Sequence, residues 1–185
     1  MAIVQTFAKR CQVLIGYLDS ETLRAQIQPT ISYSLHRESG ADYSVDGVNY
    51  HADGTIAQVW EKEQFLGELH LKLLGTHNLS NALAAVAVGR HLGLDFEVIN
   101  AALSSFEGAK RRFELRGICH EITFVDDYAH HPSEIQVTLA AARLRVVAPQ
   151  RLVAIFQPHR YSRTQTFLQE FAKSFNDADL VVSTD

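Results

Sequence analysis

The sequence predicts an α/β protein in which β hairpins and helices precede a parallel β-α-β-α-β segment. Two observations support this prediction. Up to about Lys72, short apolar runs are separated by Gly, Asp and Asn, which indicates strands joined by turns. After the basic stretch at residues 109–117, apolar strands alternate with amphipathic helices. This alternation is typical of a parallel sheet with right-handed crossovers.

Composition and charge exclude several classes of protein. The chain has 185 residues, of which 46% are hydrophobic and 21% charged, as in globular proteins. A formal net charge of -4 gives no reason to expect a nucleic-acid or membrane-surface partner. Cys11 and Cys119 lack CxxC spacing, so we expect reduced thiols. No apolar run approaches the about 18 residues of a membrane span, and we expect a cytoplasmic protein.

In the first part, β-like runs are expected at residues 11–18, 30–35, 42–60 and 69–74. Asp46-Gly47 and Asp53-Gly54 suit hairpin turns that need positive φ.

Two helices should follow these strands. Asn78 can cap one over residues 79–92, which Gly93 ends, and Asp95 can cap the second. Gly108 should end the second helix, whose apolar face is expected to be Val98, Ile99, Ala102, Leu103 and Phe106.

The second part is expected to contain strands at residues 121–126, 151–156 and 179–183, with a domain boundary near residues 112–116. Ser133 and Gln136 form a capping-box pattern that opens the first helix, and a second helix should cover residues 165–176. The chain ends where a further helix is expected, so we expect a truncated domain.

Two polar loops follow the first two of these strands, namely DDYAHHP at residues 126–132 and QPHRYSRT at residues 157–164. Because ligands bind at the carboxyl ends of parallel strands, we expect both loops to form one site rather than two solvated turns. His159, Arg160 and Arg163 are cationic, and guanidinium groups suit carboxylate or phosphate. The loops therefore predict a site for an anionic substrate.

Metal binding is an alternative for the first loop. Its possible ligands are Asp126, Asp127, His130 and His131. However, neighbouring side chains of an extended segment point to opposite faces, which separates the two histidines, so we predict no metal site. A metal-dependent phosphoesterase built on these four residues remains open, and bound divalent metal would reveal it.

A third motif, LLGTHNLSNALAAVAV, places Asn78 and Asn81 on one face of a helix N-terminus. A carboxamide can donate and accept at an adenine edge, and His77 could stack on the base. The alternative is that Asn78 only caps the helix and Asn81 is a surface amide. A noncatalytic nucleotide-binding module would also keep this pair.

Four segments, GTHNLSNALAAVAV, FEGAKRRFELRG, VDDYAHHPSEIQVTLAAAR and FQPHRYSRT, resemble the Mur ligases in their order and spacing. The resemblance covers nearly the whole chain and is weakest before Lys72. The last segment is similar to the alanine-adding branch of the family, and the alternative is the branch that recycles murein tripeptide.

The resemblance implies a peptidoglycan ligase in which ATP phosphorylates the carboxylate of UDP-N-acetylmuramate and L-alanine attacks the acyl phosphate. It implies ATP and Mg²⁺ as cofactors, with the metal ligands upstream of this chain. Residues 1–112 would be part of a central ATP-binding domain, and residues 113–185 part of a Rossmann-like C-terminal domain.

Matching motifs imply roles for individual residues. His77, Asn78 and Asn81 would hold adenine, whereas Arg112 and Asp127 would meet ATP. Tyr128, His130, Arg160 and Arg163 would line the amino-acid and acyl-phosphate side. The implied catalytic residues are thus Arg112, Asp127, His130, Arg160 and Arg163. We expect Arg111 to be a solvated linker residue, and Asp126 and His131 only to satisfy loop hydrogen bonds.

The sequence also departs from the family pattern, since it has no G-x-x-x-x-G-K-[ST] segment and no UDP-sugar domain. Phosphoryl transfer depends on the phosphate-binding loop and on Mg²⁺. We therefore expect the chain to be inactive by itself.

Overall fold

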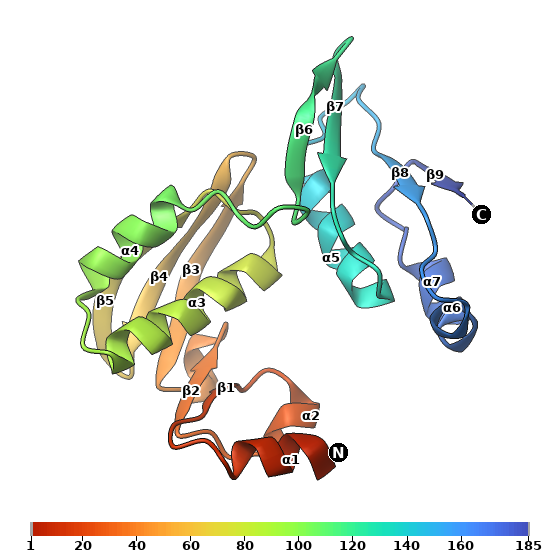
Figure 1. The fold of residues 1–185 in the computed structure, drawn as a ribbon. Coiled ribbons are helices and arrows are strands. Elements are labelled where there is room, and N and C mark those ends of the chain that lie inside the picture. Colours follow the sequence, from red (N-terminus) through yellow and green to blue (C-terminus); the bar gives the residue numbers. More distant parts are fainter. Residues whose placement is uncertain (1, 185) are drawn as a thin grey trace. The chain divides into compact units, whose positions relative to one another are not determined.

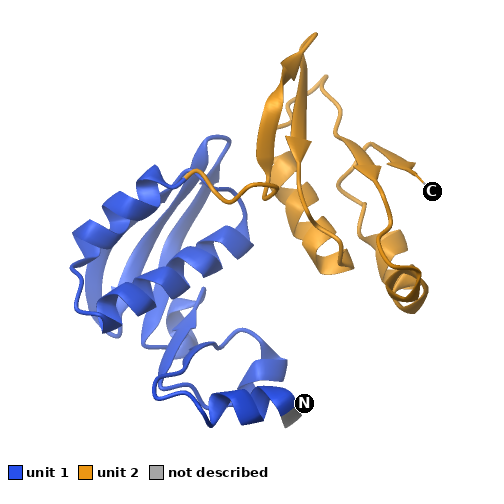
Figure 2. Ribbon diagram, in the orientation of Figure 1, with its two compact units in different colours: residues 1–106 blue, residues 107–185 orange. Residues whose placement is uncertain are grey.

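The computed structural model describes residues 2–184, and the chain divides into two compact units, residues 1–106 and 107–185 (Figure 2). Each unit has its own hydrophobic core. The predicted domain boundary after residue 112 remains a proposal.

Unit 1 is built on a five-stranded sheet in the order β1-β2-β3-β4-β5. The first three strands run parallel, and β3, β4 and β5 form an antiparallel meander. Helix α1 (Ala2–Ala8) precedes the sheet, and α2 (Glu21–Arg24) and a 3-10 helix η1 (Arg37–Ser39) connect its first strands. The strands are β1 (Ile15–Tyr17), β2 (Ile31–Ser34), β3 (Tyr43–His51), β4 (Gly54–Glu61) and β5 (Gln64–Leu71).

The hairpin predicted near Asp53-Gly54 is confirmed, but its turn lies one residue earlier and lacks the predicted positive φ. Ala52 and Asp53 connect β3 to β4, and Gly54 is the first residue of β4. A Cβ at Gly54 would clash with the carbonyl oxygen of Leu71, so glycine allows the close approach of this backbone. The turn predicted at Asp46-Gly47 is wrong, because both residues lie inside β3 at a register shift against β4. Gly47 has a φ of 55°, so its positive φ belongs to an irregularity within the strand.

Two helices, α3 (Thr76–His91) and α4 (Phe96–Ser105), cover one face of the meander (Figure 1). Helix α3 begins earlier than predicted, because Gly75, at a φ of 90°, is its N-cap residue. The prediction that Asn78 caps the helix is therefore wrong. Asp95 is the N-cap residue of α4, as predicted, although its side chain makes no capping hydrogen bond.

The apolar face predicted for α4 is only partly buried. Ile99 and Leu103 pack into the core, whereas Val98 and Phe106 are 58% and 50% exposed. Phe96, which the prediction omitted, is buried at the start of α4 and lies against Gly67 of β5. A Cβ at Gly67 would meet the Phe96 ring at 2.8 Å, so glycine allows this close packing.

Unit 2 contains two small sheets instead of one three-stranded parallel sheet. Strands β8 (Val153–Phe156) and β9 (Leu180–Ser183) are parallel, as predicted. Strand β7 (Ile122–Asp126) instead pairs antiparallel with β6 (Glu114–Cys119), so its predicted parallel pairing is wrong. The sequence prediction missed β6 because charged residues and Gly117 interrupt its apolar pattern.

A two-residue turn joins β6 to β7. His120 and Glu121 have φ values of 46° and 63°, the sign that a type I′ hairpin turn requires at both positions. Such turns usually contain Asn and Gly, neither of which occurs here, so the local sequence does not indicate this turn.

Helix α5 (Pro132–Arg143) follows β7, and two short helices, α6 (Tyr161–Thr166) and α7 (Leu168–Lys173), follow β8. The single helix predicted over residues 165–176 is therefore wrong in its bounds. Buried residues of α5 and α7 pack with β8 to form the core of this unit, namely Ile135, Leu139 and Phe171 with partly buried Ala154 and Phe156.

Candidate functional site

The two polar loops of unit 2 lie side by side. Nη1 of Arg163 donates to the carbonyl oxygen of His130 at 3.5 Å. The His131 ring also meets the Phe167 ring edge-on, with centroids 4.8 Å apart. The predicted meeting of the loops is thus confirmed, although β7 and β8 belong to different sheets.

Asp127 ties the first loop to the segment before β6. Its Oδ2 accepts a hydrogen bond from the backbone N–H of Phe113 at 2.8 Å, and its Oδ1 accepts one from Ala129 at 2.7 Å. A carboxylate oxygen has more than one lone pair, so these bonds leave capacity for a ligand. In this structure, however, Asp127 holds the backbone in place.

Arg111 packs against the same loop. Its Nε lies 3.3 Å from Oδ2 of Asp126, and its guanidinium lies over the Tyr128 ring, 4.8 Å from the centroid. Its carbonyl oxygen accepts the backbone N–H of Tyr128 at 2.8 Å. The Arg111 side chain is 57% exposed, as expected for a solvated residue, but it also contacts Asp126 and Tyr128, which the expectation did not include. Asp126 forms an ion pair in addition to lying at the start of the loop.

Glu134 organises the histidines and was missed by the sequence analysis. Its Oε2 accepts the backbone N–H groups of His130 and His131 at 2.9 and 3.1 Å. Burial raises the pKa of the Glu134 carboxyl, but these donors and the nearby charges of His130 and Arg112 outweigh burial, so the pKa is lowered. The carboxylate is therefore ionised at neutral pH.

The N-terminus of α5 explains why Glu134 is in this position. His131 is the N-cap residue, Pro132 opens the helix, and Glu134 completes the capping box. The predicted capping box of Ser133 with Gln136 is wrong by two residues, since the structure has His131 with Glu134. The prediction chose Ser133 because the usual N-cap residue of this motif is Ser or Thr. The signal in the sequence is a polar residue, His131, that is followed directly by Pro132 and three positions later by Glu134.

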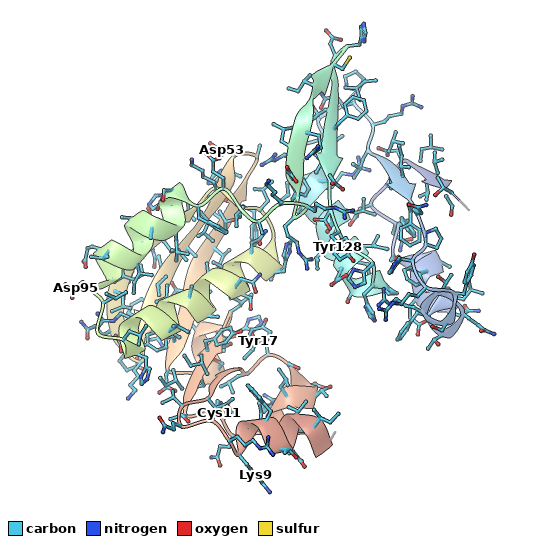
Figure 3. All side chains as sticks on the ribbon, in the orientation of Figure 1. Lys9, Cys11, Tyr17, Asp53, Asp95 and Tyr128 are labelled. Carbon is cyan, nitrogen blue, oxygen red and sulfur yellow. The ribbon has the colours of Figure 1, made fainter. Side chains whose placement is uncertain are left out.

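His130 is oriented by its neighbours. Nδ1 lies 2.8 Å from the carbonyl oxygen of Tyr128, which can only accept, so Nδ1 carries the proton. The Tyr128 and His130 rings also meet edge-on at 5.0 Å, and Figure 3 labels Tyr128 in this loop. This arrangement leaves Nε2 as the ring nitrogen able to meet a ligand.

The arginines differ in how they are held. Arg163 is half-buried and contacts the first loop, and the charge of Arg112 acts on Glu134. Arg160 is exposed at the start of α6, with a φ of 70°. Within residues 2–184 its guanidinium makes no hydrogen bond or ion pair, so no protein group fixes its orientation. Arg163 at His130 and Arg112 near Glu134 place positive charge beside the first loop, which suits an anion.

In unit 1, the asparagine pair lies in the first turns of α3. Nδ2 of Asn78 donates to the carbonyl oxygen of Leu74 at 2.7 Å, which leaves its side-chain oxygen to accept from a ligand. Asn81 is exposed and His77 is half-buried. Helical spacing puts the two amides on one face, as predicted.

Tyr17 lies beside these turns and was also missed by the sequence analysis. Its ring stacks on Tyr33 at 5.2 Å, and its hydroxyl interacts with Asp19 and with Ser80 of α3. Burial and the Asp19 carboxylate raise the pKa of Tyr17 to about 12, so the phenol stays protonated. Nothing in the local sequence distinguishes it from an ordinary strand aromatic.

The described part of the chain contains no group of three His, Cys, Asp or Glu side chains placed to hold a metal ion. The residues of the phosphoesterase alternative have other partners: Asp126 pairs with Arg111, Asp127 with backbone N–H groups, and His131 with Ser133. The structure therefore does not favour that alternative. Within residues 2–184, no helix is long and apolar enough to cross a membrane.

Comparisons with known proteins agree with these motifs. A family model described as Mur ligase middle domain matches residues 2–89, and one described as Mur ligase, glutamate ligase domain matches residues 111–185. The chain belongs to the Mur ligase family. The α/β fold and the family resemblance predicted from the sequence are thus confirmed.

This Mur ligase chain is 66% identical over 183 residues to the UDP-N-acetylmuramate--L-alanine ligase of Nostoc punctiforme, covering 99% of the chain and 38% of that protein. Among solved structures, the UDP-N-acetylmuramate-alanine ligase of Thermotoga maritima is 28% identical with a TM-score of 0.81, covering 98% of this chain and 40% of that one. The chain thus spans about two fifths of the length of these relatives.

A third relative of this Mur ligase chain is the MurF ligase of Thermotoga maritima, whose structure was determined in complex with ADP. It is 22% identical with a TM-score of 0.71, covering 91% of this chain and 39% of that one. At this identity the likeness shows the shared fold.

Proposed function

We propose that this chain is part of a ligase that uses ATP to add L-alanine to UDP-N-acetylmuramate through an acyl phosphate, a step of peptidoglycan synthesis. The observation that carries the proposal is 66% identity over 183 residues to a Nostoc punctiforme ligase of that name. The substrates are nucleotides and a free amino acid, so we propose a cytoplasmic location without a nucleic-acid or membrane partner.

Unit 1 would hold the nucleotide. The exposed amide of Asn81 can both donate and accept, and Asn78 offers its oxygen, which suits an adenine edge beside His77. ATP, when bound, supplies the phosphoryl group that activates the substrate carboxylate. We assign Mg²⁺ to no residue of this chain.

Unit 2 would hold the incoming amino acid and the charge that develops on the phosphoryl group. Arg163 and Arg160 are the proposed cations for these anions, where electrostatic stabilisation is usually the largest contribution. Tyr128 and His130 would line the same side, with Nε2 of His130 facing the ligand. Arg112 would meet the nucleotide, and Asp127 would contact it while holding the loop.

A chimaera tests the proposal. The matching 183 residues of the Nostoc punctiforme ligase are replaced by those of this chain, and phosphate release is measured. We expect release that requires ATP, UDP-N-acetylmuramate and L-alanine together, whereas the 185-residue chain alone releases none. A folded chimaera without turnover would contradict the proposal. A preference for murein tripeptide over L-alanine would assign the chain to the recycling branch.

A further inference from the structure

The guanidinium of Arg111 contacts two neighbours in the first loop at once. It lies 3.3 Å from the carboxylate of Asp126 and 4.8 Å from the centre of the Tyr128 ring. The ion pair orients the planar guanidinium, and the ring face attracts its positive charge. From this geometry we propose that Arg111 is a positioning residue that fixes the Tyr128 ring for use of the amino acid.

The backbone supports the same arrangement. The N–H of Tyr128 donates to the carbonyl oxygen of Arg111 at 2.8 Å, and the N–H of Phe113 donates to Asp127 at 2.8 Å. Two hydrogen bonds therefore hold residues 111–113 against residues 127–128. These bonds fix the backbone of Arg111 beside that of Tyr128, so the Arg111 side chain can reach the Tyr128 ring.

The backbone of Arg111 is in a conformation that is strained for a residue with a side chain. Its φ is 56°, in the left-handed region that favours glycine. Glycine would adopt this φ without strain but has no side chain to cover Tyr128. An arginine at this position therefore agrees with a role for its side chain.

Tyr128 needs such support because much of its surface is open. Tyr128 is 46% exposed, and its aromatic and cation–π contacts among the described residues are with His130 and the Arg111 guanidinium. A ring with two rotatable bonds and an exposed surface samples several rotamers, which weakens binding of a small ligand. The Arg111 guanidinium covers one face of the Tyr128 ring and so restricts the rotamers of that side chain.

The inference rests on the proposed function, which assigns Tyr128 to the amino-acid side. Loss of Arg111 should then raise the KM for L-alanine in the chimaera about three- to tenfold, the size of an exposed or partly exposed cation–π contact. The KM for ATP should change less, because the proposed adenine contacts lie in unit 1 and Arg111→Ala leaves the side chains of Arg112 and Asp127 in place. Arg111→Lys should restore part of the affinity, since an ammonium keeps the charge.

Two measurements test the inference separately from the proposed function. In the 185-residue chain, NMR of selectively labelled tyrosine follows the Tyr128 ring, which Tyr128→Phe identifies among the 6 tyrosines. Arg111→Ala should shift these signals, and Arg116→Ala should leave them unchanged. Arg116 is a matched control, because its side chain is 59% exposed, against 57% for Arg111, and it pairs with Glu114 at 3.0 Å without covering a ring.

Unchanged Tyr128 signals in Arg111→Ala would overturn the inference whether or not the chain belongs to an alanine ligase. In an active chimaera, an unchanged KM for L-alanine in Arg111→Ala would overturn it while the proposed function stands. An inactive parent chimaera would instead count against the proposed function, and the ring signals would still decide whether Arg111 fixes Tyr128. Shifted signals together with a raised KM for L-alanine would support the inference.

Discussion

The carboxylate of Asp127 accepts a hydrogen bond from the backbone N–H of Phe113 at 2.8 Å. Phe113 has a φ of 51°, so this bond holds a left-handed residue at the entrance to β6. A residue assigned to nucleotide contact by its motif thus also stabilises the loop that carries Tyr128 and His130. Its substitution should affect stability as well as turnover.

Asp127→Ala should lower the free energy of unfolding of unit 2 by about 1 to 3 kcal/mol, since two N–H groups lose a charged acceptor. Asp127→Asn should cost less, because its amide keeps one acceptor oxygen. Urea unfolding followed by circular dichroism measures both variants. Equal stability of wild type and Asp127→Ala would show that the Phe113 bond contributes nothing.

Replacing the two asparagines of α3 should have different effects on the stability of unit 1. Asn78→Ala removes the bond to the Leu74 carbonyl oxygen and should lower stability by about 1 kcal/mol. Asn81→Ala changes an exposed side chain, and its effect on stability should stay within about 0.5 kcal/mol. In the chimaera both variants should raise the KM for ATP. A stable Asn81→Ala variant with unaltered ATP affinity would contradict the adenine assignment.

Arg160 should act on the other substrate. In the chimaera, Arg160→Ala should mainly impair use of L-alanine, because the arginine is proposed to face an anion in unit 2, and KM for ATP should stay near its original value. Initial rates at varied L-alanine and ATP concentrations measure this. Lys173→Ala, an exposed cation of α7 outside the loops, is the control. Equal effects of the two variants would argue against a specific role for Arg160.

Glu134 should make the stability of unit 2 depend on pH. Its folded-state pKa is lowered from the ordinary value of 4.5, so the ionised form stabilises the fold above that value. This contribution disappears as pH falls through the folded-state pKa. At pH 7, Glu134→Gln should cost about 1 kcal/mol, as for loss of a helix cap, and the difference from wild type should shrink below pH 4.5.

Urea unfolding between pH 7 and pH 3 measures the effect of Glu134→Gln. Glu170→Gln is the matched control, because Glu170 is an exposed residue in the first turn of α7. A difference between wild type and Glu134→Gln that stays constant across this range would refute the assigned role of the charge.

In unit 1, Glu61 joins β4 to α3. It accepts hydrogen bonds from the Tyr43 hydroxyl at 2.7 Å and from Arg90 at 3.0 and 3.1 Å, and burial and Glu61 together raise the pKa of Tyr43. Glu61→Ala should cost about 2 to 3 kcal/mol, because the buried hydroxyl and the arginine lose their acceptor. Thermal or urea unfolding of unit 1 measures the loss.

Glu63 provides the comparison for Glu61. Its ion pair with Arg37 has a similar length of 2.9 Å, but the Glu63 side chain is 94% exposed. Glu63→Ala should therefore change stability by less than about 0.5 kcal/mol. Similar losses in the two variants would mean that burial does not decide the strength of these pairs.

The sequence predicted what local pattern and motif order determine. Apolar alternation located β3 and β4, and residue types at strand ends located the loops that meet through Arg163 and His130. The features that it missed depend on partners distant in sequence, or on a residue type that is unusual at a turn or helix cap. Strand β6 has a broken apolar pattern, and its ladder hydrogen bonds are made with β7.

The same reasons explain the misplaced site residues. Asn78 looks like a helix cap, but Gly75 can adopt the φ of 90° needed for an earlier start. Arg111 looks like a solvated charge, and only the fold places it over Tyr128. Glu134 was overlooked because a histidine, and not a hydroxyl residue, precedes α5.

The turn between β6 and β7 gives a way to make the protein more robust without altering either loop. His120 and Glu121 both occupy positive φ, where Asn and Gly are favoured. Replacing them with Asn-Gly should relieve this strain and raise the melting temperature. A chain stabilised at its hairpin tip could then tolerate destabilising substitutions such as Asp127→Ala, so their effects on binding could be measured in folded protein.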